Sequence, residues 1–482
     1  MLDPSTDRAL ARAYTLARDY LAGVAERPVA GPVDLAALRA ALGGPLPAAG
    51  EDPAETVAAL AAAADPGLVA SAGPRYFGFV IGGVLPAALA ADWLTSTWDQ
   101  NVAMYVMSPA AAVVEEVAEA WLVDLFGLPA GTSVGFTSGA TMANFTALAA
   151  ARHRVLADVG WSVEERGLFG APEISVVVGD EAHATIYAAL QMLGLGRDRV
   201  VRIATDAQGR MRADALRAAL ARIDAPTVVC AQAGNVNTGA FDPLPEIAAA
   251  VRSHGGWLHV DGAFGLWAAA SPERRSLVAG IAEADSWTTD DHKWLNVPYD
   301  SGLVMVRDRV AHRAAMSMGA AYYVETDGAE RDGFHWVPES SRRGRGFAVW
   351  AALRSLGRAG LADQIERGCR LAGRMADRLA EEPGIVVLND VVLNQVLVRL
   401  AAPDDDPATP SDAGSAASDA LTRDVIARVQ RDGTCWVGGT TWHGIAAMRV
   451  SISGWNTTEA DIDRSAAAII RCARAARAAF RG

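Results

Sequence analysis

Between residues 174 and 306 the sequence alternates short, continuously apolar segments with helical patterns. Six apolar segments are present: 174–178, 200–203, 227–231, 257–260, 286–289 and 302–306. Strands that are apolar at nearly every position are buried on both faces, as in a parallel sheet covered by helices. The alternation therefore predicts an α/β fold built on a mostly parallel sheet.

Three regions can be separated along the 482 residues. Residues 1–70 show helical patterns broken by Pro and Gly, and we expect an N-terminal helical arm. Residues 71–345 contain the sheet and form the expected large domain, and residues 346–482 form a smaller C-terminal α/β domain. Within the latter, 401–418 combines acidic residues with Pro and Ala, which predicts a mobile insertion.

One helix is delimited clearly by its ends, since Pro109 can begin it and Gly127 can end it. Its apolar stripe is predicted to comprise Val113, Val117, Trp121, Leu122 and Leu125. A long polar segment at 320–341 interrupts the α/β pattern, and loops of this length are often active-site lids. A plain surface connection is the alternative.

Charge and cysteine content exclude several classes of protein. The net charge is −13, with 43 Lys and Arg against 56 Asp and Glu, so an anionic partner such as nucleic acid is not expected. The four cysteines are scattered, which indicates neither a disulfide framework nor a zinc site, and no metal is expected. Neither a signal region nor a membrane-length apolar run is seen, and we expect a cytoplasmic, soluble protein.

Four motifs that carry chemistry lie at or just beyond the ends of predicted strands. They occupy 136–144, 179–183, 257–264 and 285–294. Because ligands bind at the carboxyl ends of parallel strands, four such motifs can converge on one site. Each motif alone also fits an ordinary structural role, such as a helix cap, a core histidine, a turn-capping aspartate or a solvated lysine.

The first motif predicts a phosphate site. Small and hydroxyl-bearing residues stand where a helix begins: Ser138, Gly139, Ala140 and Thr141. Such a start exposes backbone N–H groups and the positive end of the helix dipole to an anion.

The other three motifs supply groups for covalent and acid–base chemistry. His183 can stack on a planar ring or act as an acid or base. Asp261 follows a buried strand and needs a cationic partner, for which a protonated pyridine nitrogen is suitable. Lys293 is flanked by an apolar strand and Trp294, so desolvation should make its amine nucleophilic.

In their order and spacing these motifs resemble the group II pyridoxal 5′-phosphate (PLP)-dependent amino-acid decarboxylases of fold type I. The most specific pieces are His-Val-Asp-Gly-Ala at 259–263 and His-Lys-Trp at 292–294. The segment Ala233–Pro243 is also similar, and the resemblance extends from about Pro74 to the C-terminus. It implies a PLP-dependent transferase fold of type I, with PLP as cofactor and a homodimer as the assembly.

The resemblance also implies roles for individual residues. Lys293 would carry PLP as a Schiff base, with Asp261 on the pyridine nitrogen and His183 on one ring face. Other expected cofactor contacts come from the phosphate loop Ser138–Thr141 and from Asn235, Ala263, Asp290 and His292. Arg449 resembles an arginine of the small domain, and a substrate cleft is expected at Tyr76, Phe77, Trp98 and Tyr105.

Two positions depart from the family pattern. The loop tyrosine that usually precedes a His-Trp pair is missing, because Gly333 and Phe334 precede His335. Tyr322 or Tyr323 could substitute for it, and we expect Tyr323 to be catalytic. Asp290 stands where Asn is common, and its charge would repel a phosphate unless it points away or meets a cation.

The sequence thus predicts decarboxylation of an L-amino acid to its amine, with an aromatic or apolar side chain favoured. A PLP enzyme with another outcome is the alternative: decarboxylation-dependent aldehyde formation, carbon–carbon lysis or transamination. A non-catalytic scaffold fits less well, because Lys293, Asp261 and His183 occur together.

Overall fold

The computed structural model describes residues 2–318, 330–402, 405 and 415–480, and all structural statements concern these residues. A seven-stranded sheet forms the centre of the large domain, in the order β1-β7-β6-β5-β4-β2-β3. Its strands are β1 (Ser133–Thr137), β2 (Ser175–Gly179), β3 (Val201–Ile203), β4 (Thr227–Gln232), β5 (Trp257–Asp261), β6 (Ser286–Asp290) and β7 (Gly302–Val306). The structure confirms the predicted α/β class.

All strands of this sheet except β7 run in one direction. The pairs β2–β3, β2–β4, β4–β5 and β5–β6 are parallel, whereas β7 is antiparallel to both β1 and β6. The carboxyl ends of β1, β2, β4, β5 and β6 therefore meet at the same edge. This edge receives all four sequence motifs.

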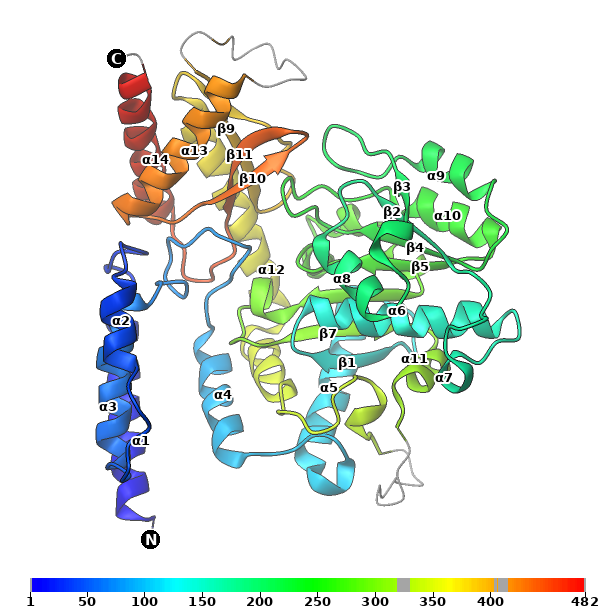
Figure 1. Cartoon of the computed structure of the whole chain (residues 1–482), viewed down its shortest axis with the longest axis horizontal. Helices are drawn as coiled ribbons and strands as arrows, with labels where there is room; N and C mark the ends of the chain where they lie inside the picture. The colour runs from blue at the N-terminus through cyan, green and yellow to red at the C-terminus, as the bar shows by residue number, and fades with distance from the viewer. Residues whose placement is uncertain (1, 319–329, 403–404, 406–414, 481–482) are drawn as a thin grey trace.

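Helices cover both faces of the sheet (Figure 1). One face is covered by α6 (Ala140–Ala157) and α8 (Ala184–Met192), and α11 (Arg309–Met316) packs on α6. The other face carries α5 (Pro109–Phe126), α9 (Ala213–Leu220), α10 (Leu244–His254) and part of the long helix α12 (Gly346–Ala380). In β4, Val228 and Cys230 pack on one layer and Val229 and Ala231 on the other, which explains the continuously apolar strand.

The C-terminal region has its own sheet and core. Its four strands, in the order β10-β11-β9-β8, are antiparallel: β8 (Ile385–Val387), β9 (Gln395–Leu400), β10 (Gly438–Trp442) and β11 (Ile445–Ser451). The end of α12, α13 (Ala416–Asp432) and α14 (Glu459–Phe480) pack against this sheet. Most of the predicted insertion at 401–418 lies outside the described residues.

The first three helices stand along one side of the molecule in Figure 1, next to α4 (Pro86–Trp98). They are α1 (Pro4–Gly23), α2 (Leu35–Leu42) and α3 (Pro53–Ala64), and none contains a buried residue. They contact one another mainly through α1 and α3. The arrangement fits the helical arm expected for residues 1–70, whose boundary remains a proposal.

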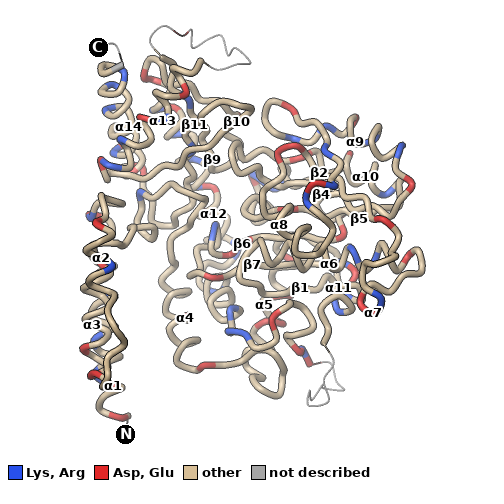
Figure 2. The backbone as a smooth tube through the Cα atoms, in the orientation of Figure 1, with Lys and Arg blue, Asp and Glu red and all other residues tan. Residues whose placement is uncertain are grey.

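Figure 2 shows acidic and basic residues interspersed along the arm and along the helices that cover the sheet. The net charge of −13 is therefore spread over the molecule rather than concentrated in one element. Among the described helices, none is both long and apolar enough to cross a membrane.

Candidate active site

Lys293 lies just beyond β6, in a single π-helical turn that spans Asp291–Leu295. Its amine is 2.8 Å from a carboxylate oxygen of Asp290, and 18% of its side chain is exposed. The chain around 76–83 passes directly beside it, since a Cβ added to Gly82 would lie 2.0 Å from the Lys293 carbonyl oxygen. Lys293 is thus a partly covered amine held at the carboxyl edge of the sheet.

Asp290 bridges the lysine and the start of α6. Its Oδ1 accepts a hydrogen bond of 2.6 Å from the Ala140 backbone N–H, and its Oδ2 contacts Lys293. Its Oδ1 also lies 3.6 Å from Nε2 of His292. Asp290, which stands where Asn is common in the family, therefore contacts the Lys293 cation. This contact offsets the repulsion between its charge and a phosphate that was expected from the sequence.

The start of α6 has the features of an anion site. Gly139 is its N-cap residue and provides no side-chain cap, and although the Ala140 N–H donates to Asp290 Oδ1, no side chain among the described residues accepts from the N–H groups of Thr141 and Met142. Gly302 lies so close that an added Cβ would be 2.5 Å from the Gly139 Cα. Of the predicted loop, Ser138 is partly buried and Thr141 is exposed.

Asp261 ends β5 with only 4% of its surface exposed. It accepts hydrogen bonds from the Ala263 N–H at 3.1 Å and from Nδ2 of Asn144 at 3.3 Å. No ion pair to Asp261 is found among the described residues. A buried carboxylate without a cation is costly, so its surroundings suit a cationic ring nitrogen.

His183 follows β2 and is the N-cap residue of α8. Its Nδ1 lies 2.9 Å from the Thr185 hydroxyl and 3.3 Å from the Thr185 N–H. Burial lowers the pKa of His183, although the charge of Asp261 acts in the opposite direction. His292 likewise has a pKa lowered by burial, and its ring stacks on Tyr299 at 4.3 Å. Both imidazoles are therefore neutral near pH 7.

Arg449 of β11 is the predicted small-domain arginine. Burial lowers its pKa, and the one hydrogen bond found for its guanidinium among the described residues is long, 3.5 Å to Oδ1 of Asn237. No carboxylate pairs with it among the described residues, although its field reaches His183. A partly buried guanidinium without a carboxylate partner is suited to an anionic ligand.

Among the remaining predicted site residues, Asn235 lies next to the sheet edge, whereas the two loop tyrosines cannot be placed. Asn235 caps a turn by accepting from the backbone N–H groups of Asn237 and Thr238, and contacts Gln232, which pairs with Asp261 across β4 and β5. Tyr322 and Tyr323 lie outside the described residues.

The four predicted cleft residues are not brought together. Phe77 is buried in the core of the small domain. Trp98 is 47% exposed and packs on Phe347, and the Tyr105 N–H donates to Asp332. Tyr76 stacks on Trp436 at 5.1 Å.

An aromatic cluster that the sequence did not reveal lies beside this segment. Phe79 stacks on Trp436 at 5.4 Å and is 60% exposed, and its backbone is left-handed with a φ of 54°. Tyr299 stacks on His292, and burial raises the pKa of Tyr299 to about 12. Tyr76 and Phe79 thus share Trp436 as a stacking partner, and Tyr299 stacks separately on His292, the residue before Lys293.

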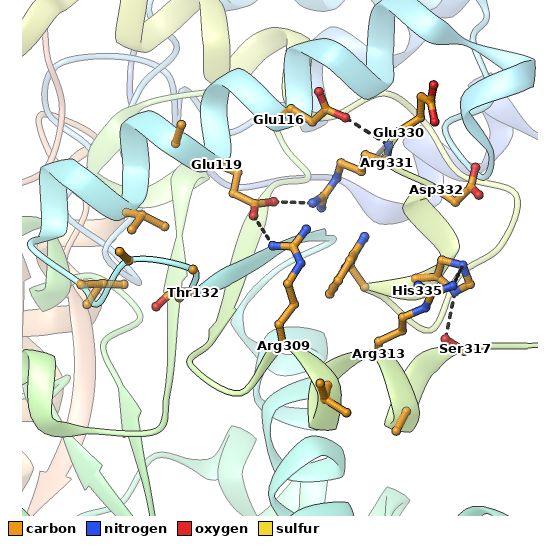
Figure 3. A pocket seen from close by; sticks show the side chains of 18 of the residues that line it. Glu116, Glu119, Thr132, Arg309, Arg313, Ser317, Glu330, Arg331, Asp332 and His335 are labelled. Atoms are coloured by element: carbon orange, nitrogen blue, oxygen red, sulfur yellow. Dashed lines mark hydrogen bonds and ion pairs between the residues drawn. The ribbon is translucent and has the colours of Figure 1, made fainter. Parts of the chain in front are cut away.

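A larger cavity, of about 1060 Å³, lies away from these residues between α5 and α11 (Figure 3). Ion pairs cross its wall, where Glu119 contacts both Arg309 and Arg331. None of Lys293, Asp261 and His183 lines it. Size alone therefore does not locate the reactive centre of this protein.

The residues at the sheet edge fit pyridoxal 5′-phosphate. Asp261 provides a buried carboxylate without a cation for the ring nitrogen, and the first turn of α6, beyond the Ala140 N–H that donates to Asp290, provides donors for the phosphate. Lys293 supplies an amine at the same edge.

Comparison with known proteins identifies the family. The model named "Pyridoxal-dependent decarboxylase conserved domain" matches residues 46–401. The acidic amino acid decarboxylase GADL1 of Mus musculus is 30% identical over 323 residues, which cover 65% of this chain and 58% of that protein. The chain thus spans less than two thirds of that relative's length. The aromatic-L-amino-acid decarboxylase of Bacillus atrophaeus is 28% identical over 395 residues, 80% of each chain.

Among solved structures, Oryza sativa TDC with PLP and tryptamine superimposes with a TM-score of 0.90. It is 23% identical, with 98% of this chain and 99% of that chain covered, and it confirms the predicted fold. Because the family model covers most of the sequence and the sheet edge provides the groups that the cofactor requires, the chain belongs to the pyridoxal-dependent decarboxylase family, whose cofactor is pyridoxal 5′-phosphate.

Proposed function

We propose that this protein decarboxylates an L-amino acid to the corresponding amine. The observation that carries the proposal is the placement of Lys293, Asp261 and His183 at one sheet edge in a chain of this family. When bound, pyridoxal 5′-phosphate supplies an aldehyde that reacts with amines and a ring that withdraws electrons from the substrate α-carbon.

The protein's own groups then have distinct tasks. The Lys293 amine would attach the cofactor and be displaced by the substrate amine. Asp261 would keep the ring nitrogen protonated, which makes the ring an effective electron acceptor. The N–H groups at the start of α6 would bind the phosphate, and His183 would lie on one ring face as an acid for the α-carbon. The partly buried Arg449 would bind a substrate carboxylate.

We further propose that the substrate has an aromatic or apolar side chain. Two groups of rings support this preference, because aromatic rings favour apolar and aromatic surfaces: Tyr76 and Phe79 stacked on Trp436, and Tyr299 stacked on His292 beside Lys293. The similar proteins are described as acting on acidic and on aromatic amino acids, so family membership alone leaves the side chain open.

Aldehyde formation is the second candidate. Residues 330–341 contain no tyrosine, and Gly333 has no room for one, since an added Cβ would be 2.1 Å from the Val102 carbonyl oxygen. Without a hydroxyl to protonate the α-carbon, that carbon can instead react with O2. The products would then be CO2, aldehyde, ammonia and peroxide, with O2 as the oxidant.

A panel of L-amino acids tests these proposals. The PLP-loaded enzyme is expected to release CO2 and an amine, fastest with aromatic or apolar substrates. Aldehyde together with peroxide would establish the second candidate, and preferred turnover of acidic substrates would contradict the proposed side chain. The variant Lys293→Ala should lose the visible absorption band of lysine-bound PLP. Absence of that band from the wild-type protein would overturn the assignment of Lys293.

The family resemblance and the exposed arm also lead us to propose a homodimer. The supporting observation is that α1, α2 and α3 bury none of their residues within one chain.

A further inference from the structure

Asn144 lies fully buried in α6, behind the proposed cofactor site. Its Nδ2 donates to Asp261 Oδ2 at 3.3 Å and to the Thr185 hydroxyl at 3.0 Å. Its Oδ1 accepts from the Thr288 hydroxyl at 2.8 Å and lies 3.0 Å from Nε2 of His259. Both donors and both acceptor positions of the amide are thus used.

The directions of these hydrogen bonds follow from the Asp261 carboxylate, which only accepts and therefore requires the NH2 group of Asn144 to face it. The Trp257 indole N–H can only donate, and it lies 2.9 Å from the Ser286 oxygen. The Ser286 hydroxyl hydrogen is then free to donate to Nδ1 of His259, at 2.9 Å. With the Asn144 oxygen facing His259, Nε2 of His259 carries the hydrogen and donates to Asn144, and burial lowers the pKa of His259 to about 4, which keeps it neutral.

The amide of Asn144 therefore has a single orientation. Its oxygen must face the donors His259 and Thr288, so its NH2 group faces Asp261 and Thr185. The reverse orientation would place the amide oxygen against the Asp261 carboxylate, with two acceptors in contact.

The second branch leads to the imidazole of the site. Because the Thr185 oxygen accepts from Asn144, its own hydrogen can donate to Nδ1 of His183 at 2.9 Å. The Thr185 backbone N–H points to the same nitrogen at 3.3 Å. Nδ1 is therefore an acceptor, and the neutral His183 ring carries its hydrogen on Nε2.

We propose that Asn144 is a positioning residue that serves both sides of the cofactor. It orients the Asp261 carboxylate directly, and through the Thr185 hydroxyl it reinforces the His183 tautomer with hydrogen on Nε2, which the Thr185 backbone N–H also favours. The inference rests on the proposed roles of Asp261 and His183. In addition, one buried amide links the contact of Asp261 with the ring nitrogen to the tautomer of His183.

Two substitutions separate the branches. Asn144→Ala removes both, and we expect PLP affinity to fall by roughly 10-fold or more, the scale seen when partners of metal ligands are removed. The pH at which the visible band of the bound cofactor changes should shift as well. Thr185→Val removes only the branch to His183, so PLP affinity should stay within about threefold while kcat falls by roughly 10-fold. Thr185→Ser keeps the hydroxyl and should restore kcat.

Thr146→Val is the matched control, because Thr146 is also buried in α6 and its hydroxyl donates only to the Met142 carbonyl oxygen at 2.8 Å. PLP affinity is measured by fluorescence titration and folding by circular dichroism. An N144A protein with wild-type affinity and an unchanged band would overturn the proposal, as would an equal loss in T146V. If N144A does not fold, Asn144→Ser is measured in its place, with the same two outcomes.

The proposed branch to His183 would be contradicted if T185V and T185S lowered kcat equally, or if neither variant lowered kcat. Failure of the inference differs from failure of the proposed function. In the first case the wild-type protein binds PLP and shows its band, and only the Asn144 and Thr185 variants behave otherwise than expected. In the second case the wild-type protein itself shows no band of lysine-bound PLP.

Discussion

Two adjacent carboxyl groups at the active-site turn differ in their surroundings. Asp290 contacts the Lys293 amine and the start of α6. Asp291 is fully buried, and its Oδ2 accepts from the Ser301 hydroxyl at 2.8 Å, whereas no partner is found for its Oδ1 among the described residues. Burial, with a smaller effect of the Asp290 charge, raises the pKa of Asp291 to about 8. The sequence Asp-Asp gave no sign of this difference.

This raised pKa predicts how stability depends on pH. Between pH 4 and 8 the folded protein holds a proton on Asp291 that the unfolded chain has released, so this group lowers the free energy of unfolding as pH rises. Asp291→Asn removes this pH dependence. The increase in the free energy of unfolding that the substitution causes should therefore be larger at pH 8 than at pH 6 by about 2 kcal/mol. That difference corresponds to a shift of about 2 °C in Tm.

Differential scanning calorimetry of the apo-protein at both pH values measures the shift. His292 and Lys293 are common to both proteins, so their titration cancels in the comparison unless the substitution disturbs them. An equal benefit of D291N at the two pH values would show that Asp291 is ionised in the folded protein throughout this range.

At the scale of single elements, α5 shows where sequence patterns succeed and where they fail. Its ends, Pro109 and Phe126, were predicted correctly, because Gly127 takes the left-handed conformation with a φ of 67°. The predicted stripe was partly wrong: Val113 is 46% exposed, and the buried face contains Glu115 instead. An apolar pattern cannot anticipate a buried glutamate whose partners come from residues more than 200 positions away.

Those partners fasten the segment 331–342 to α5. Arg342 donates to both carboxylate oxygens of Glu115, at 2.6 and 2.8 Å, and Arg331 donates to Glu115 at 3.3 Å. Arg331 also contacts Glu119, on the cavity wall drawn in Figure 3. The two guanidinium groups outweigh the effect of burial, which is the largest single influence, and lower the pKa of Glu115.

Removing one residue of the cluster Glu115, Arg331 and Arg342 should leave a buried charge poorly compensated. We expect Arg342→Ala to lower the free energy of unfolding by about 3–5 kcal/mol, as measured by urea denaturation. The control is Arg358→Ala, because the Arg358–Asp124 pair is largely exposed, with 62% and 72% of the side chains accessible, and should leave stability unchanged. Equal stability of the R342A and wild-type proteins would show that Glu115 is protonated or hydrated rather than ion-paired.

For the whole molecule, the sequence predicted the sheet and the convergence of its motifs because parallel strands deliver their carboxyl ends to one edge. Lys293, Asp261 and His183 follow strands predicted to within one or two residues. Phe79, Trp436 and Tyr299 were missed, since their contacts arise from packing between distant segments and from the left-handed backbone at Phe79. Asn144 was interpreted only as part of a phosphate motif, because its partners lie on three other elements, β5, β6 and α8.

The arm presents an apolar stripe that a single chain leaves open. On α1, Leu10, Tyr14 and Leu21 fall within about 40° of one another around the helix axis, given the helical repeat, and are 53%, 55% and 43% exposed. Tyr14 makes an edge contact with Trp93 of α4, which is itself 40% exposed. Such a stripe would be unfavourable in water unless another chain covers it, which supports the proposed homodimer.

We therefore expect light scattering after size-exclusion chromatography to give the mass of two chains at micromolar concentration. The double substitution Leu10→Asp and Leu21→Asp places charges on the stripe and should shift the protein to monomers, because burying unpaired carboxylates in an interface is costly. Phe169→Asp is the matched control: this ring is 99% exposed on the large domain, away from the arm, and its replacement should leave the dimer intact. A wild-type monomer, or a dimer that survives both arm substitutions, would show that α1 does not form the interface.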